Sequence, residues 1–373
     1  MSIDPNDEKF LAMIEEQGRI GDRFAKIRRL GKNGGGGSFS LLFEAEDEQC
    51  KNALIALKFL HPFERNAYRR QCFERESVVL QRLTGQRDII QLVTPRAEFT
   101  YTLQPHGFEI PFSYYAIELA KTDLGALIES NRIDAHTALL HFRVMCRSIK
   151  RLHSLRIAHR DVKPANFLVM TDGSVKLSDF GTARVLDGMS PGLLSDYAQF
   201  PPGDLGYVAP EMLASLHDDD PYIALGADIF ALGSCFFEMF SGVPLGVQIF
   251  NRSFQDDLMQ AMGAVRRGQR IRVFNQFVTN IANSHRLPSL AAFGPFTPAC
   301  ILQQVDDLYR SMAALDYRQR IKDFEHIFLK INRCLLTLDN QEKIRIWRER
   351  RERERKAALE KRQNKLRSML IRS

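Results

Sequence analysis

Residues 157–181, IAHRDVKPANFLVMTDGSVKLSDFG, decide the fold and the function of this chain. Two short apolar runs flank a turn at residues 171–173, which predicts a β-hairpin closed by a glycine-assisted reversal. The residues before the first run and after the second therefore emerge at the same end of the hairpin. We expect Asp161, Asn166 and Asp179 to meet there. Two carboxylates and an amide suit Mg²⁺, because this ion prefers oxygen ligands.

This stretch resembles the catalytic loop and magnesium loop of eukaryotic-type serine/threonine protein kinases. The match to H-R-D-x-K-x-x-N followed by D-F-G is complete. The resemblance implies that Asp161 accepts the proton of the substrate hydroxyl and that Lys163 lies near the transferred phosphate. It also implies that Asn166 and Asp179 hold Mg²⁺, with Mn²⁺ as the second choice. From the residues alone, the alternative is a hairpin whose Asp and Asn side chains only cap turns.

A single lysine interrupts the apolar strand that we expect at residues 53–60. A lysine in such a strand is costly unless its ammonium group reaches a partner. Residues 73–83 predict a helix with an apolar stripe, and Glu76 lies on this stripe. The kinase resemblance places Lys58 on the α- and β-phosphates of ATP, with Glu76 as its ion-pair partner. The alternative for Glu76 is a solvated acid on a helix surface.

A glycine-rich stretch, residues 31–40, lies between strands expected at residues 22–30 and 41–46. Glycine lets backbone N–H groups approach phosphate oxygens without obstruction by side chains. The stretch resembles the kinase glycine-rich loop, but it is longer, and Ser40 stands where the third glycine is usual. A flexible linker is the alternative. The resemblance implies an ATP site lined by Gly35, Gly37, Ser38, Phe39, Leu42, Ala56, Lys58, Glu118, Ala120, Asp123 and Leu168.

Two further strands, at residues 89–93 and 112–119, are expected to complete a five-stranded sheet. The connection between them is longer than usual and contains Pro95, Pro105 and Pro111. By resemblance, Ile117 is the gatekeeper and residues 118–120 form the hinge that pairs with adenine. Asp123 either bonds the ribose or caps the helix that begins near Leu124, and the sequence leaves both open.

The segment after Asp179 ends in Ala-Pro-Glu at residues 209–211, as kinase activation segments do. Arg160 is of the kind that needs an acidic or phosphorylated partner. Asp204 replaces the threonine that usually bridges the catalytic Asp and Lys, so it either supplies a built-in negative charge or depresses catalysis. The candidate phosphorylation sites are Ser190, Ser195 and Tyr197.

Three residues are expected to hold the larger lobe together. By resemblance, Asp228 accepts hydrogen bonds from the catalytic-loop backbone, and Arg320 pairs with Glu211. The weakly charged run at residues 223–250 is long enough to suggest a membrane span. Its glycines and two acids favour a buried core helix instead, because acids are costly in lipid.

Composition places the chain among globular proteins, with 45% hydrophobic and 26% charged residues in 373. Six cysteines are scattered without paired spacing, and the N-terminus, MSIDPNDEKF, shows no secretory pattern. Both observations favour a reducing, cytoplasmic location. The net charge is +7, but residues 341–373 alone carry 13 Lys/Arg and 5 Asp/Glu, which leaves the body at −1.

This basic tail is predicted to be a helix, because opposite charges such as Glu349 and Arg353 occur four residues apart. A solvated helical extension is one interpretation. The others are a polyanion-binding segment, for nucleic acid or an anionic membrane surface, and a coiled-coil partner for another helix.

The motifs together predict an α+β, two-lobed protein kinase that uses ATP and Mg²⁺ to phosphorylate Ser/Thr hydroxyls of proteins, including itself. We expect a helical extension at residues 1–21, a β-rich small lobe at 22–119, a helical large lobe at 120–338 and a basic helical tail at 339–373. The alternatives are a pseudokinase-like scaffold, a small-molecule phosphotransferase of the same fold, and a nucleic-acid-binding protein.

Overall fold

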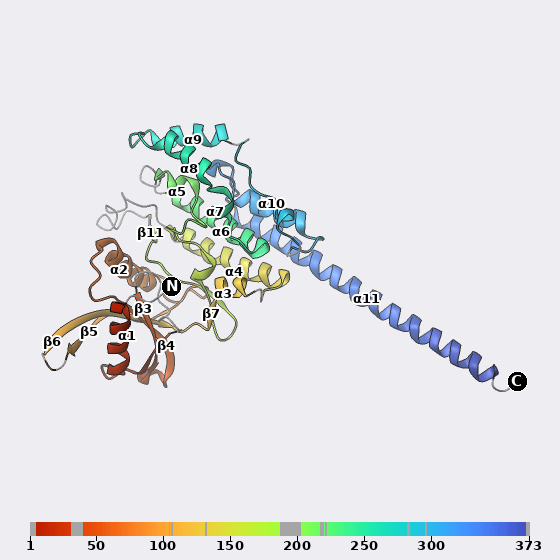
Figure 1. Ribbon diagram of the computed structural model, residues 1–373, viewed down its shortest axis with the longest axis horizontal. Helices are drawn as coiled ribbons and strands as arrows, with labels where there is room; N and C mark the ends of the chain where they lie inside the picture. The colour runs from red at the N-terminus through yellow and green to blue at the C-terminus, as the bar shows by residue number, and fades with distance from the viewer. Residues whose placement is uncertain are drawn as a thin grey trace.

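The computed structural model has a β-rich small lobe, a helical large lobe and a long C-terminal helix (Figure 1). This confirms the predicted fold. The description covers residues 5–30, 40–103, 105, 107–130, 133–186, 203–216, 220, 222–281, 284–294 and 297–370.

The small lobe is built on an antiparallel sheet in the order β1-β2-β3-β4-β6-β5. Its strands are β1 (Arg19–Ile20), β2 (Phe24–Arg29), β3 (Ser40–Asp47), β4 (Ala53–Leu60), β5 (Leu92–Leu103) and β6 (Phe108–Glu118). Helix α1 (Pro5–Gln17) covers the face that carries Leu57 and Phe59. Helix α2 (Ala67–Arg82) contributes to the core on the other face, with Ala56. Alternate β4 residues thus serve two cores, because strand side chains alternate between faces.

Two expectations for this lobe are wrong. The sheet has a sixth strand, the two-residue β1, which pairs with the start of β2. The strands expected at residues 89–93 and 112–119 continue into their connection, because β5 and β6 form one hairpin that stays paired out to Leu103 and Phe108. Pro95 lies where the register of β5 shifts, and Pro111 lies beyond the reach of β4. Neither proline therefore costs a ladder hydrogen bond, which is how strands tolerate proline.

The large lobe is organised around α6 (Ile223–Ser241), which is buried along most of its length. The other helices are α3 (Leu124–Glu129), α4 (Ala135–Ser154), α5 (Pro210–Leu213), α7 (Leu245–Ile249), α8 (Arg252–Met262), α9 (Arg270–Ile281) and α10 (Leu302–Met312). Among the described helices, α6 alone is long and apolar enough to cross a membrane, and 83% of that window is buried inside the protein. This agrees with the expected core helix.

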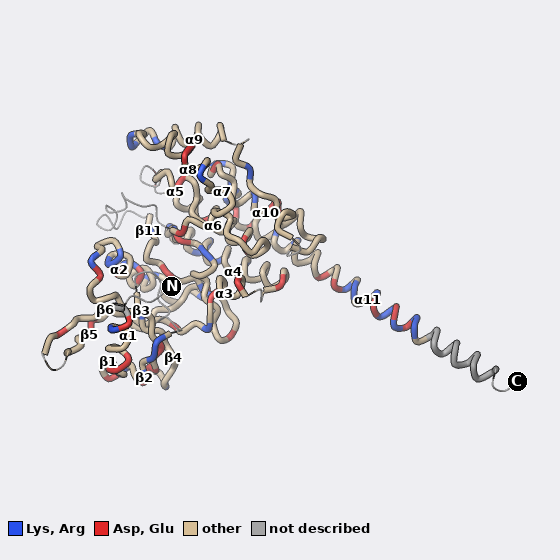
Figure 2. The backbone as a smooth tube through the Cα atoms, viewed as in Figure 1, with Lys and Arg blue, Asp and Glu red and all other residues tan. Residues whose placement is uncertain are grey.

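Helix α11 (Phe324–Leu370) begins in the large lobe and continues far beyond it (Figure 1). Ile327, Ile331 and Cys334 are buried in the core of that lobe. From Gln341 to Ala357 every residue is exposed, and basic and acidic residues alternate along the helix (Figure 2). Ion pairs one turn apart, such as Arg350 with Glu354 at 3.0 Å, support the helix from within.

Candidate active site

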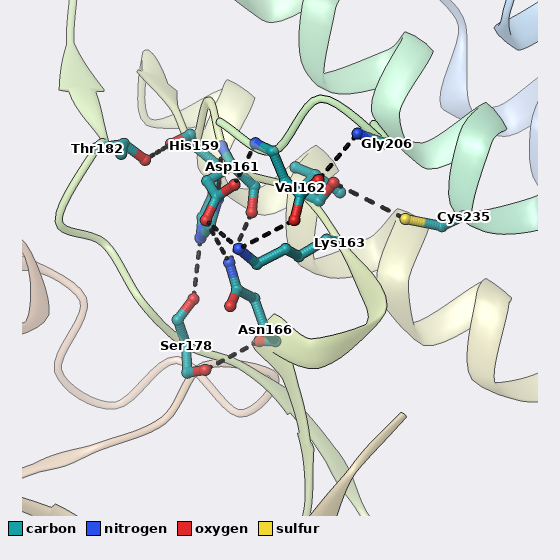
Figure 3. Close-up of polar contacts among 10 residues, drawn as sticks. His159, Asp161, Val162, Lys163, Asn166, Ser178, Thr182, Gly206 and Cys235 are labelled. Atoms are coloured by element: carbon teal, nitrogen blue, oxygen red, sulfur yellow. Dashed lines mark hydrogen bonds and ion pairs between the residues drawn. The ribbon is translucent and has the colours of Figure 1, made fainter. Parts of the chain in front are cut away.

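The catalytic loop lies beside a small hairpin of the large lobe. Strands β9 (Phe167–Val169) and β10 (Val175–Leu177) pair in antiparallel fashion, and Ser178 N donates to Asn166 O at 2.8 Å. The Asn166 amide reaches back, and its Nδ2 donates to Asp161 O at 2.7 Å and to Asp161 Oδ2 at 3.0 Å (Figure 3). Since Nδ2 makes both bonds, Asn166 Oδ1 remains for a cation.

Lys163 lies between two carboxylates. Its Nζ is 3.1 Å from Asp161 Oδ2 and 3.9 Å from Asp204 Oδ2. Burial acts to lower the pKa of Lys163, but the charge and hydrogen bond of Asp161, together with the charges of Asp204 and Asp179, outweigh it, and the pKa is raised. The lysine therefore carries a positive charge next to the carboxylate of Asp161.

Asp179 follows β10 in the left-handed region, with φ +61°. Phe180 next to it is fully buried and packs edge-on against the ring of His159. Burial acts to raise the pKa of Asp179, but the nearby Lys58 and other positive groups lower it. An ionised Asp179 is thus held where the sequence predicted a metal ligand.

A divalent ion fits this donor set, with one ionised carboxylate and one amide oxygen. Mg²⁺ is commonly held by few protein ligands, with substrate phosphates and water supplying the rest. Within the described residues there is no group of three His, Cys, Asp or Glu side chains that would hold a metal alone.

Lys58 on β4 and Glu76 on α2 form the expected ion pair, with Nζ to Oε2 at 2.6 Å. Their side chains are only 15% and 4% exposed. Burial acts to lower the pKa of Lys58, but the carboxylates of Glu76 and Asp179 outweigh it and raise that pKa. The charge of Asp179 in the large lobe thus acts on Lys58 in the small lobe, so the two side chains lie near each other.

The hinge follows β6. Ala56 lies opposite Ile117 in the sheet, and Lys121 N donates to Val169 O at 2.9 Å. Within the described part of the chain, the backbone of Ala120 makes no hydrogen bond, so its N–H and carbonyl are available to a ligand. Asp123 lies opposite Leu168, in the pairing of β7 (Thr122–Asp123) with β9, and Leu42 lies opposite Lys58.

The protein kinase domain family model matches residues 26–329 of this chain. The chain belongs to the protein kinase family. Mitogen-activated protein kinase spm1 of Cytospora mali is 25% identical over 346 residues, which cover 88% of this chain and 75% of the relative. Mitogen-activated protein kinase 15 of Mus musculus is 30% identical over 241 residues, 63% of this chain and 40% of the relative. These findings confirm the predicted serine/threonine protein kinase.

Asp204 takes the place of the bridging threonine by a different set of bonds. Its backbone N–H donates to Asp161 Oδ1 at 3.1 Å, and its own Oδ1 accepts from Gly206 N at 2.9 Å. Two carboxylates placed this close would repel each other, but here an N–H group of Asp204, and not its carboxylate, faces Asp161. Gly203 precedes it with φ +104°, and a Cβ there would lie 2.8 Å from Arg160 O, so the kinase needs glycine at this position.

The anchors of the large lobe occupy their expected places. Asp228 accepts hydrogen bonds from His159 N at 2.9 Å and from Arg160 N at 2.8 Å. Arg320 Nη2 donates to Glu211 Oε2 at 2.8 Å, and both side chains are fully buried. Asp123 Oδ1 accepts from Ala126 N at 2.9 Å, so this residue caps α3.

Sequence reasoning missed two contacts of the kinase. Arg75, next to Glu76 on α2, donates from Nη1 to Gly181 O at 2.5 Å and so ties that helix to the Asp-Phe-Gly turn. Tyr207 donates its hydroxyl to Glu238 Oε2 at 2.7 Å. The only sign of Glu238 in the sequence was its own charge within the otherwise apolar run of α6.

Seven of the predicted site residues lie outside the described part of the chain. They are Gly35, Gly37, Ser38, Phe39, Ser190, Ser195 and Tyr197.

Proposed function

We propose that this kinase transfers the γ-phosphate of ATP, bound with Mg²⁺ or Mn²⁺, to Ser and Thr hydroxyls of protein substrates and of itself. The observation that carries the proposal is the convergence of Lys58 with Asp179 and of Asp161 with Asn166 and Lys163. Phosphoryl transfer depends on positioning and on neutralising charge, and this set of side chains supplies both.

Each residue in the proposal has a separate task. Asp161 accepts the proton of the substrate hydroxyl, and Lys163 balances negative charge on the transferred phosphate. Lys58, oriented by Glu76, holds the α- and β-phosphates. Asn166 and Asp179 would hold the metal, which supplies charge neutralisation between the phosphates.

The nucleotide base is proposed to pair with the free backbone of Ala120 and with Glu118 O. Ala56, Leu42 and Leu168 supply apolar surface around it. Asp123 caps α3 through Oδ1, and we propose that its Oδ2 is left to bond the ribose. The glycine-rich stretch is proposed to cover the phosphates, through Gly35, Gly37, Ser38 and Phe39.

Regulation is proposed to rest on Asp204 and on the activation segment. The position of Asp204 beside Lys163 supports a built-in negative charge over an inhibitory one. Ser190, Ser195 and Tyr197 stay candidate phosphorylation sites, with Arg160 as the group that would receive a phosphate. If mass spectrometry of active protein finds all three unmodified, that role is contradicted.

The exposed, basic part of α11 is proposed to bind a polyanion, namely nucleic acid or an anionic membrane surface. A helical partner is the second choice. The proposed location of the kinase is the cytoplasm.

Incubation with ATP-Mg²⁺ and a generic Ser/Thr substrate tests the activity, with phosphorylated residues identified by mass spectrometry. We expect phosphoserine or phosphothreonine on the substrate and on the kinase itself, and neither with Asp161→Asn. Equal signals from the two proteins would contradict intrinsic activity and assign the chain a pseudokinase-like scaffold role.

A further inference from the structure

The β5–β6 hairpin extends well beyond the sheet that carries the nucleotide-binding residues (Figure 1). Strand β4 pairs with β6 only at residues 114–118, whereas β5 and β6 remain paired out to Leu103 and Phe108. The outer half of the hairpin, residues 98–103 and 108–113, is therefore a two-stranded ribbon. Such a ribbon is only marginally stable in water unless it packs against something else.

One face of this ribbon is apolar along its whole length. It is formed by three cross-strand pairs, Phe99 with Phe112, Tyr101 with Ile110, and Leu103 with Phe108. Phe112 at the base is fully buried in the core under α1. At the tip, Leu103 is 37% exposed and Phe108 is 67% exposed. The apolar face thus runs out of the core into solvent.

Strand β5 lies at the edge of the sheet formed by the described strands. Helix α2 covers the start of this edge, where Arg96 N donates to Ser77 Oγ at 3.2 Å and the Arg96 guanidinium pairs with Glu74. Beyond Arg96, no described residue hydrogen-bonds to the outer edge of β5. Natural proteins guard such edges with proline, lysine or a bulge. Residues 98–103, EFTYTL, contain neither residue, and their pairing with β6 is regular.

The pairing of β5 with β6 shows which backbone N–H and C=O groups of β5 point toward its outer edge. Thr100 lies opposite Pro111, which has no N–H group. In an antiparallel ladder, every second pair of opposite residues is not hydrogen-bonded, and the N–H and C=O groups of such a pair point away from the partner strand. Because Pro111 has no N–H group to donate, the pair of Thr100 and Pro111 fits this non-hydrogen-bonded kind. The backbone groups of Thr100 and Thr102 therefore face the outer edge of β5, where another strand can bind them.

We propose that this edge pairs with the same edge of a second copy of the chain, antiparallel about a twofold axis at Tyr101. The segment Phe99-Thr100-Tyr101-Thr102-Leu103 has nearly the same pattern in both directions. Across the axis, Thr100 of one copy faces Thr102 of the other, and Phe99 faces Leu103. An interface between identical surfaces requires this self-complementarity.

The residues that would face each other across the axis favour a second copy of the chain as the partner. Thr–Thr and aromatic–aliphatic pairs stabilise neighbouring strands, and no charged residue lies between Phe99 and Leu103, so like charges do not meet. The outward groups of Thr100 and Thr102 form the hydrogen-bonded pairs of the new ladder. A twofold axis perpendicular to the sheet keeps both apolar faces on one side. The exposed tip of each copy then lies beside the α1-covered base of the other.

A charge swap on the polar face tests the register. Thr100 and Thr102 are exposed, so their side chains can be changed with little effect on the monomer. In Thr100→Lys/Thr102→Lys, each lysine faces a lysine of the second copy. In the matched variant Thr100→Lys/Thr102→Glu, each lysine faces a glutamate. Thermal unfolding of the two monomers checks that both variants fold.

Sedimentation and light scattering, from about 1 to about 100 µM protein, give the association state. We expect wild type and the Lys/Glu variant to form dimers and the Lys/Lys variant to stay monomeric. A wild type that is monomeric throughout would overturn the proposal and leave the edge to an extended segment of a different protein. Dimers that persist in the Lys/Lys variant would also overturn it.

Cross-linking gives an independent readout. Facing residues on the axis have Cα atoms about 4.5 to 5.5 Å apart, within reach of a disulfide. Tyr101→Cys is therefore expected to form a covalent dimer under mild oxidation. The control Glu98→Cys places its thiols far from the axis and is expected to cross-link no more than wild type, which has exposed Cys50 and Cys300. Equal cross-linking of the two variants would contradict the register.

Discussion

The carboxylate of Asp204 lies 3.9 Å from the ammonium group of Lys163, in the position that a threonine usually holds in this family. The backbone N–H of Asp204 donates to Asp161 Oδ1 at 3.1 Å, so the two carboxylates do not meet directly. A second negative charge is thus accommodated beside Asp161, the residue proposed as the base.

The first prediction concerns this substitution. Asp204→Thr is expected to change turnover by less than about threefold, under about 1 kcal/mol in activation free energy, because a hydroxyl can also bond Lys163. Asp204→Leu, which removes the charge and the acceptor for Gly206 N, is expected to lower turnover more. Steady-state kinetics with saturating ATP measures both. A large gain in turnover for Asp204→Thr would show that the native residue depresses catalysis.

The second prediction concerns the buried ion pair of the small lobe. Lys58→Met is expected to lower kcat/KM by about 10²- to 10³-fold, because it removes a preorganised positive charge from the phosphates. Lys26→Met is the matched control, since Lys26 pairs with Glu46 at the surface of the same sheet. Kinetic measurement of both variants with ATP varied checks this. Similar losses in the two variants would argue for a general effect on the lobe.

The third prediction concerns the anchor of the large lobe. Arg320→Met leaves the carboxylate of Glu211 buried without its partner, and we expect a loss of about 3 to 5 kcal/mol in the free energy of unfolding. Arg318→Met breaks a more exposed pair with Asp316 and is expected to cost less than about 1 kcal/mol. Urea unfolding measures both values. Equal losses would contradict the role of Arg320.

The fourth prediction is a pH dependence that arises at Glu238. Burial raises the pKa of Glu238 to about 7, against the hydrogen bond from Tyr207 that lowers it. The native state therefore binds a proton that the unfolded chain releases near pH 4.5. This stabilisation is fully present below pH 4.5 and is lost as the pH rises through about 7.

The variant Glu238→Gln removes this titration. Relative to wild type, its free energy of unfolding is expected to increase by up to about 3 kcal/mol between pH 5 and pH 8. Urea unfolding of both proteins at the two pH values gives the difference. A difference that does not change with pH would contradict a raised pKa at Glu238.

The fifth prediction concerns the exposed end of α11. Deletion of residues 341–373 removes a net charge of +8 and is expected to weaken binding to RNA and to anionic vesicles at least tenfold at low salt. Turnover is expected to stay the same, because residues 341–357 are exposed along their length. A full-length control with Arg351, Arg353 and Arg355 changed to Gln separates charge from length. Unchanged binding after deletion would exclude a polyanion partner.

The closeness of Asp161, Lys163 and Asn166 was predictable because these residues occur at fixed local spacings. The loop from His159 to Asn166 is held by short-range bonds, and the hairpin that brings in Asp179 has a turn that its sequence specifies. The ion pair of Lys58 was predictable for a second reason, since a buried charge in an apolar strand requires a partner.

The outer half of the β5–β6 hairpin was missed, because the first of the two expected strands ended at residue 93 and the second began at residue 112. The alternation of Phe99, Tyr101 and Leu103 is a strand signal. Pro111 is tolerated because no strand in the described part of the chain pairs with it on the side of β6 away from β5. Contacts such as Arg75 with Gly181 join residues 106 positions apart, and no local pattern specifies such a pair.

Transfer of labelled γ-phosphate from ATP-Mg²⁺ to a Ser/Thr substrate, compared between wild type and Asp161→Asn, tests the central claim most directly. Calorimetry with ATP-Mg²⁺ on both proteins shows whether nucleotide binding is intact. We expect equal nucleotide affinity and a transfer rate about 10²- to 10⁴-fold lower in the variant, because the base that accepts the hydroxyl proton is gone. Equal transfer rates, or a wild type that does not bind ATP with any divalent metal, would contradict the claim.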